Sequence, residues 1–129
     1  MPPGKEAAYA QALPGLMRML KVLHDGGVTL MPGSDGFAGY SLHRELELYA
    51  QAGIPNAEVL RIATLVPARV LGVEKDRGTI TPGKLADMVL VDGDPLKDMS
   101  HIRRVWRTLK GGQVFDPAAL EQALGMNPR

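Results

Sequence analysis

The sequence predicts an α/β fold, in which helices accompany a buried parallel strand and shorter strands follow. Two observations carry this prediction. A helical repeat of apolar residues stops at Gly26-Gly27 and runs directly into Val28–Met31, which is apolar apart from one threonine. Such runs are typical of strands buried on both faces of a parallel sheet. From about Glu74 the pattern changes to short strand-like runs separated by glycine and proline turns.

The composition fits one globular domain and excludes several protein classes. A chain of 129 residues with 45% hydrophobic residues can bury a core. The net charge of +1 gives no indication of nucleic acid or an acidic membrane as a partner. The sequence has no cysteine, which excludes disulfides and thiolate metal sites, and no apolar run approaches the ~20 residues of a membrane span. We expect a cytoplasmic location, with a signal peptide upstream of Met1 as the open alternative.

Four helices are predicted before residue 74. The first covers about residues 5–25, with an interruption or restart near Pro14. The second begins at Ser41, a common N-cap residue, and ends at Gly53. A third covers about residues 56–64, with Asn56 as its candidate cap, and a fourth begins at Pro67. In the second helix the expected buried stripe is Leu42, Leu46, Tyr49 and Ala50, and the expected solvent face is Arg44, Glu45, Glu47 and Gln51.

Strands and turns are predicted for the second half. Gly78–Ile80 and residues 86–91 are expected strands on either side of a turn at Pro82-Gly83, since glycine accepts the positive φ that this turn needs. Residues 104–110 and 113–115 are expected to form a hairpin through Gly111-Gly112. Asp116 then caps a short terminal helix.

One carboxylate, Asp35, follows the predicted buried strand among small residues. In α/β proteins, ligands and catalytic groups collect at the C-terminal ends of strands, and flanking glycines allow a close approach. Loop aspartates also commonly cap turns or helices, and the local sequence alone favours that role. A single parallel strand needs neighbours for its hydrogen bonds. We therefore expect the chain to be the tail of a longer protein.

Three stretches make the sequence recognisable: GSDG at 33–36, LHRELELYAQAGI at 42–54, and GTITPGKLADMVLVDGDP at 78–95, which is the most specific. In this order they resemble the C-terminal end of the amidohydrolase superfamily, and within it the imidazolonepropionase-like and prolidase-like branch. The resemblance covers about residues 21–114. It is specific for the family and uninformative about the substrate.

The resemblance implies the last βα units of a (β/α)₈ TIM-like barrel followed by part of a small β-sandwich. Residues 1–73 would be the barrel end, with Val28–Met31 as its eighth strand. Residues 74–115 would belong to the sandwich, and residues 116–129 would form a terminal helix and tail. In this family Asp35 would coordinate a catalytic divalent metal, zinc being the favoured ion, and would accept a proton from the attacking metal-bound water. A bound metal lowers the pKa of water towards ~7, and a carboxylate within reach can pass the proton to the leaving amine.

The other ligands expected for such a site are not in this sequence. The family's His-x-His pair needs two histidines two residues apart, whereas this chain has His24, His43 and His101. One carboxylate supplies too few donors for a metal. We therefore expect this chain alone to hold no metal and to be inactive, with the missing N-terminal barrel portion as its partner. The complete protein is expected to be a homo-oligomer that hydrolyses C–N bonds of small amide, peptide-like or cyclic imide substrates. The alternative is a non-catalytic scaffold or interaction module derived from the same fold.

Other residues are weaker candidates. His43 follows Asp35 and could contact substrate, although an exposed first-turn histidine is favoured. Ser34 lacks a histidine base placed to activate it. Structural roles are expected for Lys84 with Asp87, and for Asp92 with Asp94, rather than catalysis or calcium binding. The basic run Arg103, Arg104, Trp106, Arg107 and Lys110 is expected to be a solvated strand rather than a surface for single-stranded nucleic acid.

Overall fold

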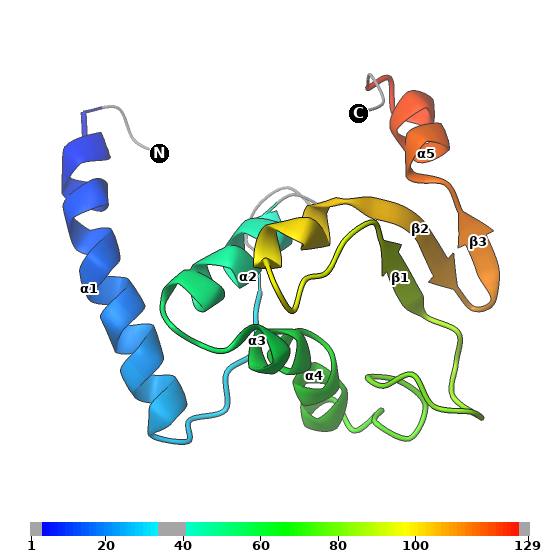
Figure 1. Cartoon of the computed structure of the whole chain (residues 1–129), viewed down its shortest axis with the longest axis horizontal. Coiled ribbons are helices and arrows are strands. Elements are labelled where there is room, and N and C mark those ends of the chain that lie inside the picture. Colours follow the sequence, from blue (N-terminus) through cyan, green and yellow to red (C-terminus); the bar gives the residue numbers. More distant parts are fainter. Residues whose placement is uncertain (1–3, 34–40, 127–129) are drawn as a thin grey trace.

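The computed structural model describes residues 4–33 and 41–126 (Figure 1). These residues form an α/β arrangement in which the larger helices precede a small antiparallel sheet, as the sequence predicts. They form neither a closed barrel nor a second sheet layer. In chain order the elements are α1 (Glu6–Asp25), α2 (Ser41–Gln51), α3 (Asn56–Ala63), α4 (Leu65–Val70), β1 (Met88–Val91), η1 (Met99–Arg103), β2 (Val105–Lys110), β3 (Gln113–Phe115) and α5 (Pro117–Ala123).

The three described strands form one antiparallel sheet in the order β1-β2-β3. The β1–β2 register shifts between Leu90 and Val91, which marks a β-bulge. Strands β2 and β3 are joined by Gly111-Gly112, with φ angles of 56° and 81°. Positive φ at both central residues is what a tight type I′ hairpin requires. The predicted hairpin is therefore confirmed.

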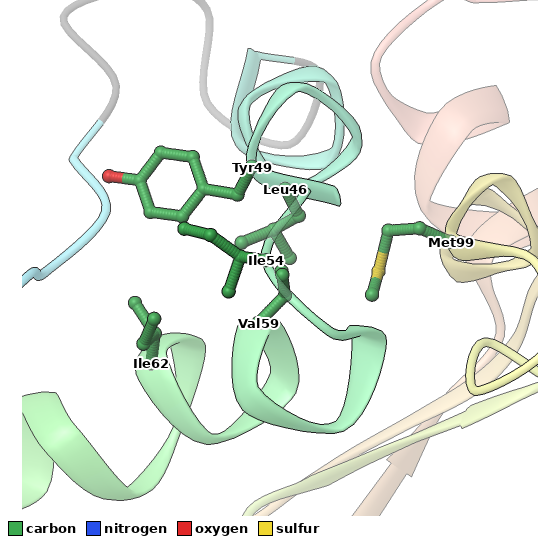
Figure 2. Close-up of a cluster of buried hydrophobic side chains, with 6 residues drawn as sticks. All are labelled: Leu46, Tyr49, Ile54, Val59, Ile62 and Met99. Carbon is green, nitrogen blue, oxygen red and sulfur yellow. The ribbon is translucent and has the colours of Figure 1, made fainter. Parts of the chain in front are cut away.

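The core lies where α2, α3 and η1 meet (Figure 2). Val59 of α3 is completely buried, and Ile54 in the α2–α3 connection is 2% exposed. The predicted buried stripe of α2 is confirmed at Leu46 and Tyr49, whereas Leu42 is 38% exposed. The cluster consists of Leu46, Tyr49, Ile54, Val59, Ile62 and Met99.

Helix α1 lies along one edge of the molecule (Figure 1), and α2 is its one substantial neighbour among the described elements. It continues through Pro14, so the predicted interruption is wrong. Proline removes one backbone hydrogen bond, but the surrounding Ala, Leu and Met residues are strong helix formers that sustain the rest. None of the described helices is long and apolar enough to cross a membrane.

Val28–Met31, predicted to be a strand, has irregular backbone without a ladder partner in the described chain. The amide of Val28 donates to the Leu23 carbonyl (3.0 Å) at the end of α1. Leu30 packs against the core, whereas Val28 and Met31 are 50% and 49% exposed. A parallel strand forms only beside other strands. Within residues 4–33 and 41–126, no strand pairs with Val28–Met31. The prediction of a strand at Val28–Met31 is therefore wrong for the described part of the chain.

Smaller differences concern turns and caps. Gly78–Ile80 is a bend rather than a strand, although the turn at Pro82-Gly83 is present, with a φ of 91° at Gly83. Asn56 does not cap α3; its amide instead donates to the Leu96 carbonyl (3.0 Å). Helix α4 begins two residues before Pro67. Asp116 caps α5 as predicted, accepting a hydrogen bond from the amide of Ala118 (3.0 Å).

Candidate active site

The main candidate, Asp35, lies in residues 34–40, outside the described residues, and so does Ser34. The structure describes both ends of this segment. Gly33 precedes it, and Ser41, the first residue of α2, follows it. The proposed role of Asp35 therefore stays a prediction. The structure describes only the residues on either side of its segment.

Glu45 connects these two ends. Its Oε1 atom accepts a hydrogen bond from the Gly33 amide (3.3 Å) and another from the Tyr49 hydroxyl (3.2 Å). Residues four apart on a helix lie on one face, so Glu45 and Tyr49 of α2 can share this contact. In Figure 2 the Tyr49 ring lies in the core cluster and its hydroxyl points out of it. Glu45 is therefore held between the core and the chain that leads to Asp35.

The phenol of Tyr49 remains a donor at neutral pH. Burial, followed by the negative charge of Glu45 and the hydrogen bond to it, raises the pKa of Tyr49 to about 12. The sequence had placed Glu45 on the solvent face of its helix, whereas the structure shows it half-buried and bonded on two sides. The Glu–Tyr spacing of four, with the tyrosine in the buried stripe, is the signal that could have indicated this pair.

His43 lies half-buried in the first turn of α2, beside a groove of about 710 Å³ that β2 and α5 also line. Two of the arginines in this groove have acidic partners: Arg103 pairs with Glu47, and Arg107 pairs with Asp116 (3.3 Å). The sequence did not predict that His43 would share a groove with this basic run. Of the basic run, Trp106, Arg107 and Lys110 lie in β2, whereas Arg103 ends η1. The expectation that the run does not bind nucleic acid stays a prediction.

Lys84 and Asp87, considered as a catalytic pair, have separate structural contacts. The Lys84 ammonium donates to the carbonyls of Glu74 (2.5 Å) and Arg77 (3.2 Å). The Asp87 carboxylate accepts hydrogen bonds from Arg77, Lys110 and the Gly111 amide. Both side chains fasten the connection before β1, as expected.

The acidic turn after β1 is also held by local hydrogen bonds. Asp94 Oδ1 accepts from the Leu96 amide (3.0 Å), and the Asp94 amide donates to Nδ1 of His101 (3.0 Å). At the end of α1, His24 Nδ1 lies 3.0 Å from a carboxylate oxygen of Asp25. Across residues 4–33 and 41–126, no group of three or more His, Asp or Glu side chains could hold a metal ion. These residues by themselves do not form a metal site.

Comparison with known proteins identifies the family. The Amidohydrolase family matches residues 10–115, which is most of the chain and includes both ends of the Asp35 segment. The chain belongs to this amidohydrolase family.

The relatives of this amidohydrolase chain are longer proteins. An N-acetylgalactosamine-6-phosphate deacetylase of Escherichia coli O157:H7 is 33% identical over 84 residues, covering 63% of this chain and 21% of that protein. A solved Xaa-Pro dipeptidase with bound methionine in its active site matches with a TM-score of 0.74 at 27% identity, covering 80% of this chain and 26% of that one. A solved prolidase complexed with N-methylphosphonate-L-proline has a TM-score of 0.74 at 30% identity, covering 90% of this chain and 30% of that one.

These matches confirm the predicted resemblance to amidohydrolases, with prolidase-like proteins among the structural relatives. The chain spans less than half of the length of the Escherichia coli relatives that it matches, and less than a third of these two solved structures.

Proposed function

We propose that this chain is the C-terminal portion of a metal-dependent amidohydrolase that hydrolyses a C–N bond of a small amide, peptide-like or cyclic imide substrate. The observation that carries the proposal is the family match over residues 10–115. The names of the relatives support the reaction class, since a deacetylase of an N-acetyl sugar, a dipeptidase and a prolidase all cleave C–N bonds. The architecture proposed for this portion is the last βα units of a (β/α)₈ barrel, followed by part of a small β-sandwich and a terminal helix.

Asp35 is the residue of this chain that we assign to the chemistry. Its carboxylate would supply one ligand to a divalent metal, zinc being the favoured ion, and the remaining ligands would come from polypeptide outside this sequence. An ionised carboxylate can also take a proton from the attacking water and give it to the leaving amine. His43, near the start of the helix that follows, is proposed as a substrate contact. The complete enzyme is proposed to be a homo-oligomer.

Replacement of Asp35 tests this assignment. In the complete hydrolase that contains this chain, Asp35→Asn keeps the side-chain shape but removes the charge and the proton acceptor, so turnover is expected to be abolished while the fold is retained. Hydrolysis of prolyl dipeptides, N-acetyl sugars and cyclic imides would be measured with added zinc, together with circular dichroism. Asp92→Asn, in the turn after β1, makes the same chemical change as a matched control and is expected to leave turnover unchanged.

Near-normal turnover by the Asp35→Asn protein would remove Asp35 from the mechanism. The genomic sequence in frame upstream of Met1 gives an independent test. A His-x-His strand and later histidines there would support the hydrolase. Their absence would support the other class of function, a non-catalytic scaffold built on the same fold.

A further inference from the structure

We propose that Glu45 is a positioning residue for Asp35, because its carboxylate holds Gly33, the last described residue before Asp35. This inference rests on the proposed role of Asp35. Glu45 itself is assigned no contact with substrate or metal.

The topology of the contact supports this role. Gly33 is the last described residue before the segment, and Glu45 lies four residues after Ser41, at which the segment ends. The hydrogen bond from the Gly33 amide to Glu45 (3.3 Å) therefore ties the entrance of the segment to the helix that forms its exit. Holding both ends of a short segment removes many of the conformations that it could otherwise adopt. A catalytic group works efficiently only when it is held near its productive geometry.

The acceptor is itself held from behind. Tyr49 is 8% exposed and belongs to the core cluster, and its hydroxyl donates to the same Oε1 atom that Gly33 reaches. A carboxylate oxygen has two lone pairs, so it can accept both hydrogen bonds at once. Its charge also strengthens each of them relative to a neutral acceptor. Gly33 is thus connected through one carboxylate to the buried centre of the molecule.

A second carboxylate on the same helix provides a matched control. Glu47 pairs with Arg44 (3.0 Å) and with Arg103 of η1. The hydrogen bond from Arg103, more than any other contact, holds the pKa of Glu47 below its usual range. Removing its charge should affect the packing of η1 on α2 without changing the entrance to the Asp35 segment.

The first experiment measures these hydrogen bonds in the complete hydrolase that contains this chain. In the Glu45→Ala protein, the Gly33 amide should exchange with solvent faster than in the unmodified protein. In the Glu45→Gln protein, the Tyr49 phenol should lose its proton at a lower pH than in the unmodified protein. Since burial is the largest cause of the raised pKa, that titration should still lie above the ordinary value near 10. NMR would report both, with Tyr49→Phe identifying the phenol signal. The control variant Glu47→Gln should change neither the Gly33 exchange rate nor the Tyr49 titration. An unchanged Gly33 exchange rate in Glu45→Ala would overturn the proposal.

The second experiment uses the complete hydrolase. For Glu45→Ala, kcat is expected to fall by roughly tenfold or more with little change in KM, because a small displacement of a catalytic group lowers the rate without removing substrate contacts. Glu45→Gln keeps an acceptor oxygen and should recover part of this loss. If Glu45→Ala does not fold, the Tyr49→Phe enzyme tests the positioning role instead, because it lacks the hydroxyl donor but keeps the ring in the core. Its kcat should fall below that of the unmodified enzyme, by less than the loss expected for Glu45→Ala.

The outcomes separate this proposal from the proposed function. An inactive Asp35→Asn enzyme beside a Glu45→Ala or Tyr49→Phe enzyme of normal kcat would overturn the positioning role alone. Normal turnover by Asp35→Asn would overturn the assigned role of Asp35 and the positioning role with it, whereas an unmodified enzyme that hydrolyses none of the substrates would overturn the proposed function. Equal losses in Glu45→Gln and Glu47→Gln would show a general effect on stability and would also overturn the positioning role.

Discussion

Asp87 shows how a single side chain can organise distant parts of this chain. Its carboxylate, 18% exposed, accepts hydrogen bonds from the Gly111 amide (2.7 Å), the Arg77 guanidinium (2.9 Å) and the Lys110 ammonium (3.0 Å). The Gly111 bond contributes most, and together these donors hold the pKa of Asp87 far below its usual range. The connection before β1 is thereby fastened to the β2–β3 hairpin.

This contact predicts an acid-dependent loss of stability. Because the pKa of Asp87 is lower in the folded chain than in the unfolded chain, its contribution is complete above the unfolded pKa near 4 and is lost as pH falls from about 5 towards 2. Asp87→Asn should lower the melting temperature at neutral pH and reduce the fall on acidification. Thermal melts from pH 7 to pH 2.5 would measure this. Asp76→Asn, an exposed carboxylate in the same connection, should leave the profile unchanged.

At the scale of elements, backbone geometry decides which glycines can be replaced. Gly93, between β1 and η1, has a φ of 138°, and an added Cβ would lie 2.8 Å from Nδ1 of His101. Gly15 lies inside α1, where the nearest atom to an added Cβ is 4.0 Å away, on Arg18. The same substitution should therefore have opposite effects in the two elements.

Gly93→Ala is expected to destabilise the chain by roughly 1–3 kcal/mol, because alanine tolerates this φ poorly and would displace the His101 ring. Gly15→Ala is expected to stabilise it by about 0.5–1 kcal/mol, because alanine loses less backbone entropy in a helix. Urea titration of both variants would measure the free energies of unfolding. A stabilised Gly93→Ala chain would mean that this turn is not as tightly packed as the structure shows.

The elements also show what the sequence could predict. Helices α1 to α3 and the hairpin at Gly111-Gly112 follow from spacing and turn residues that act within a few positions of one another. Val28–Met31 has the composition of a strand, but a strand also needs neighbours, and those are not encoded in its own residues. Glu45 was misplaced for a related reason: its inward contact depends on Gly33, which is twelve residues earlier in the sequence. Asp35 was singled out by its position after a strand-like run, its role was assigned by resemblance, and that role stays a prediction.

At the scale of the whole molecule, one apolar strip on α1 has no cover among the described residues. Met17, Leu20 and His24 are half-buried and turn towards the rest of the chain. About a quarter turn away on the helix, four large apolar residues are 38–55% exposed: Tyr9, Leu16, Met19 and Leu23. Val28 and Met31, in the chain that follows α1, are also about half exposed. In the proposed hydrolase, the rest of the enzyme would cover this strip.

The isolated 129-residue chain is therefore expected to self-associate, because contiguous exposed apolar surface is removed from water when molecules associate. Size-exclusion chromatography with light scattering should show species larger than the monomer. Leu16→Glu places a charge in the middle of the strip and should shift the chain towards the monomer. Gln11→Glu adds the same charge at an exposed position outside the strip and should not. A monodisperse monomer of the unmodified chain that melts cooperatively would contradict the expectation, and would mean that this surface is stable in water without a partner.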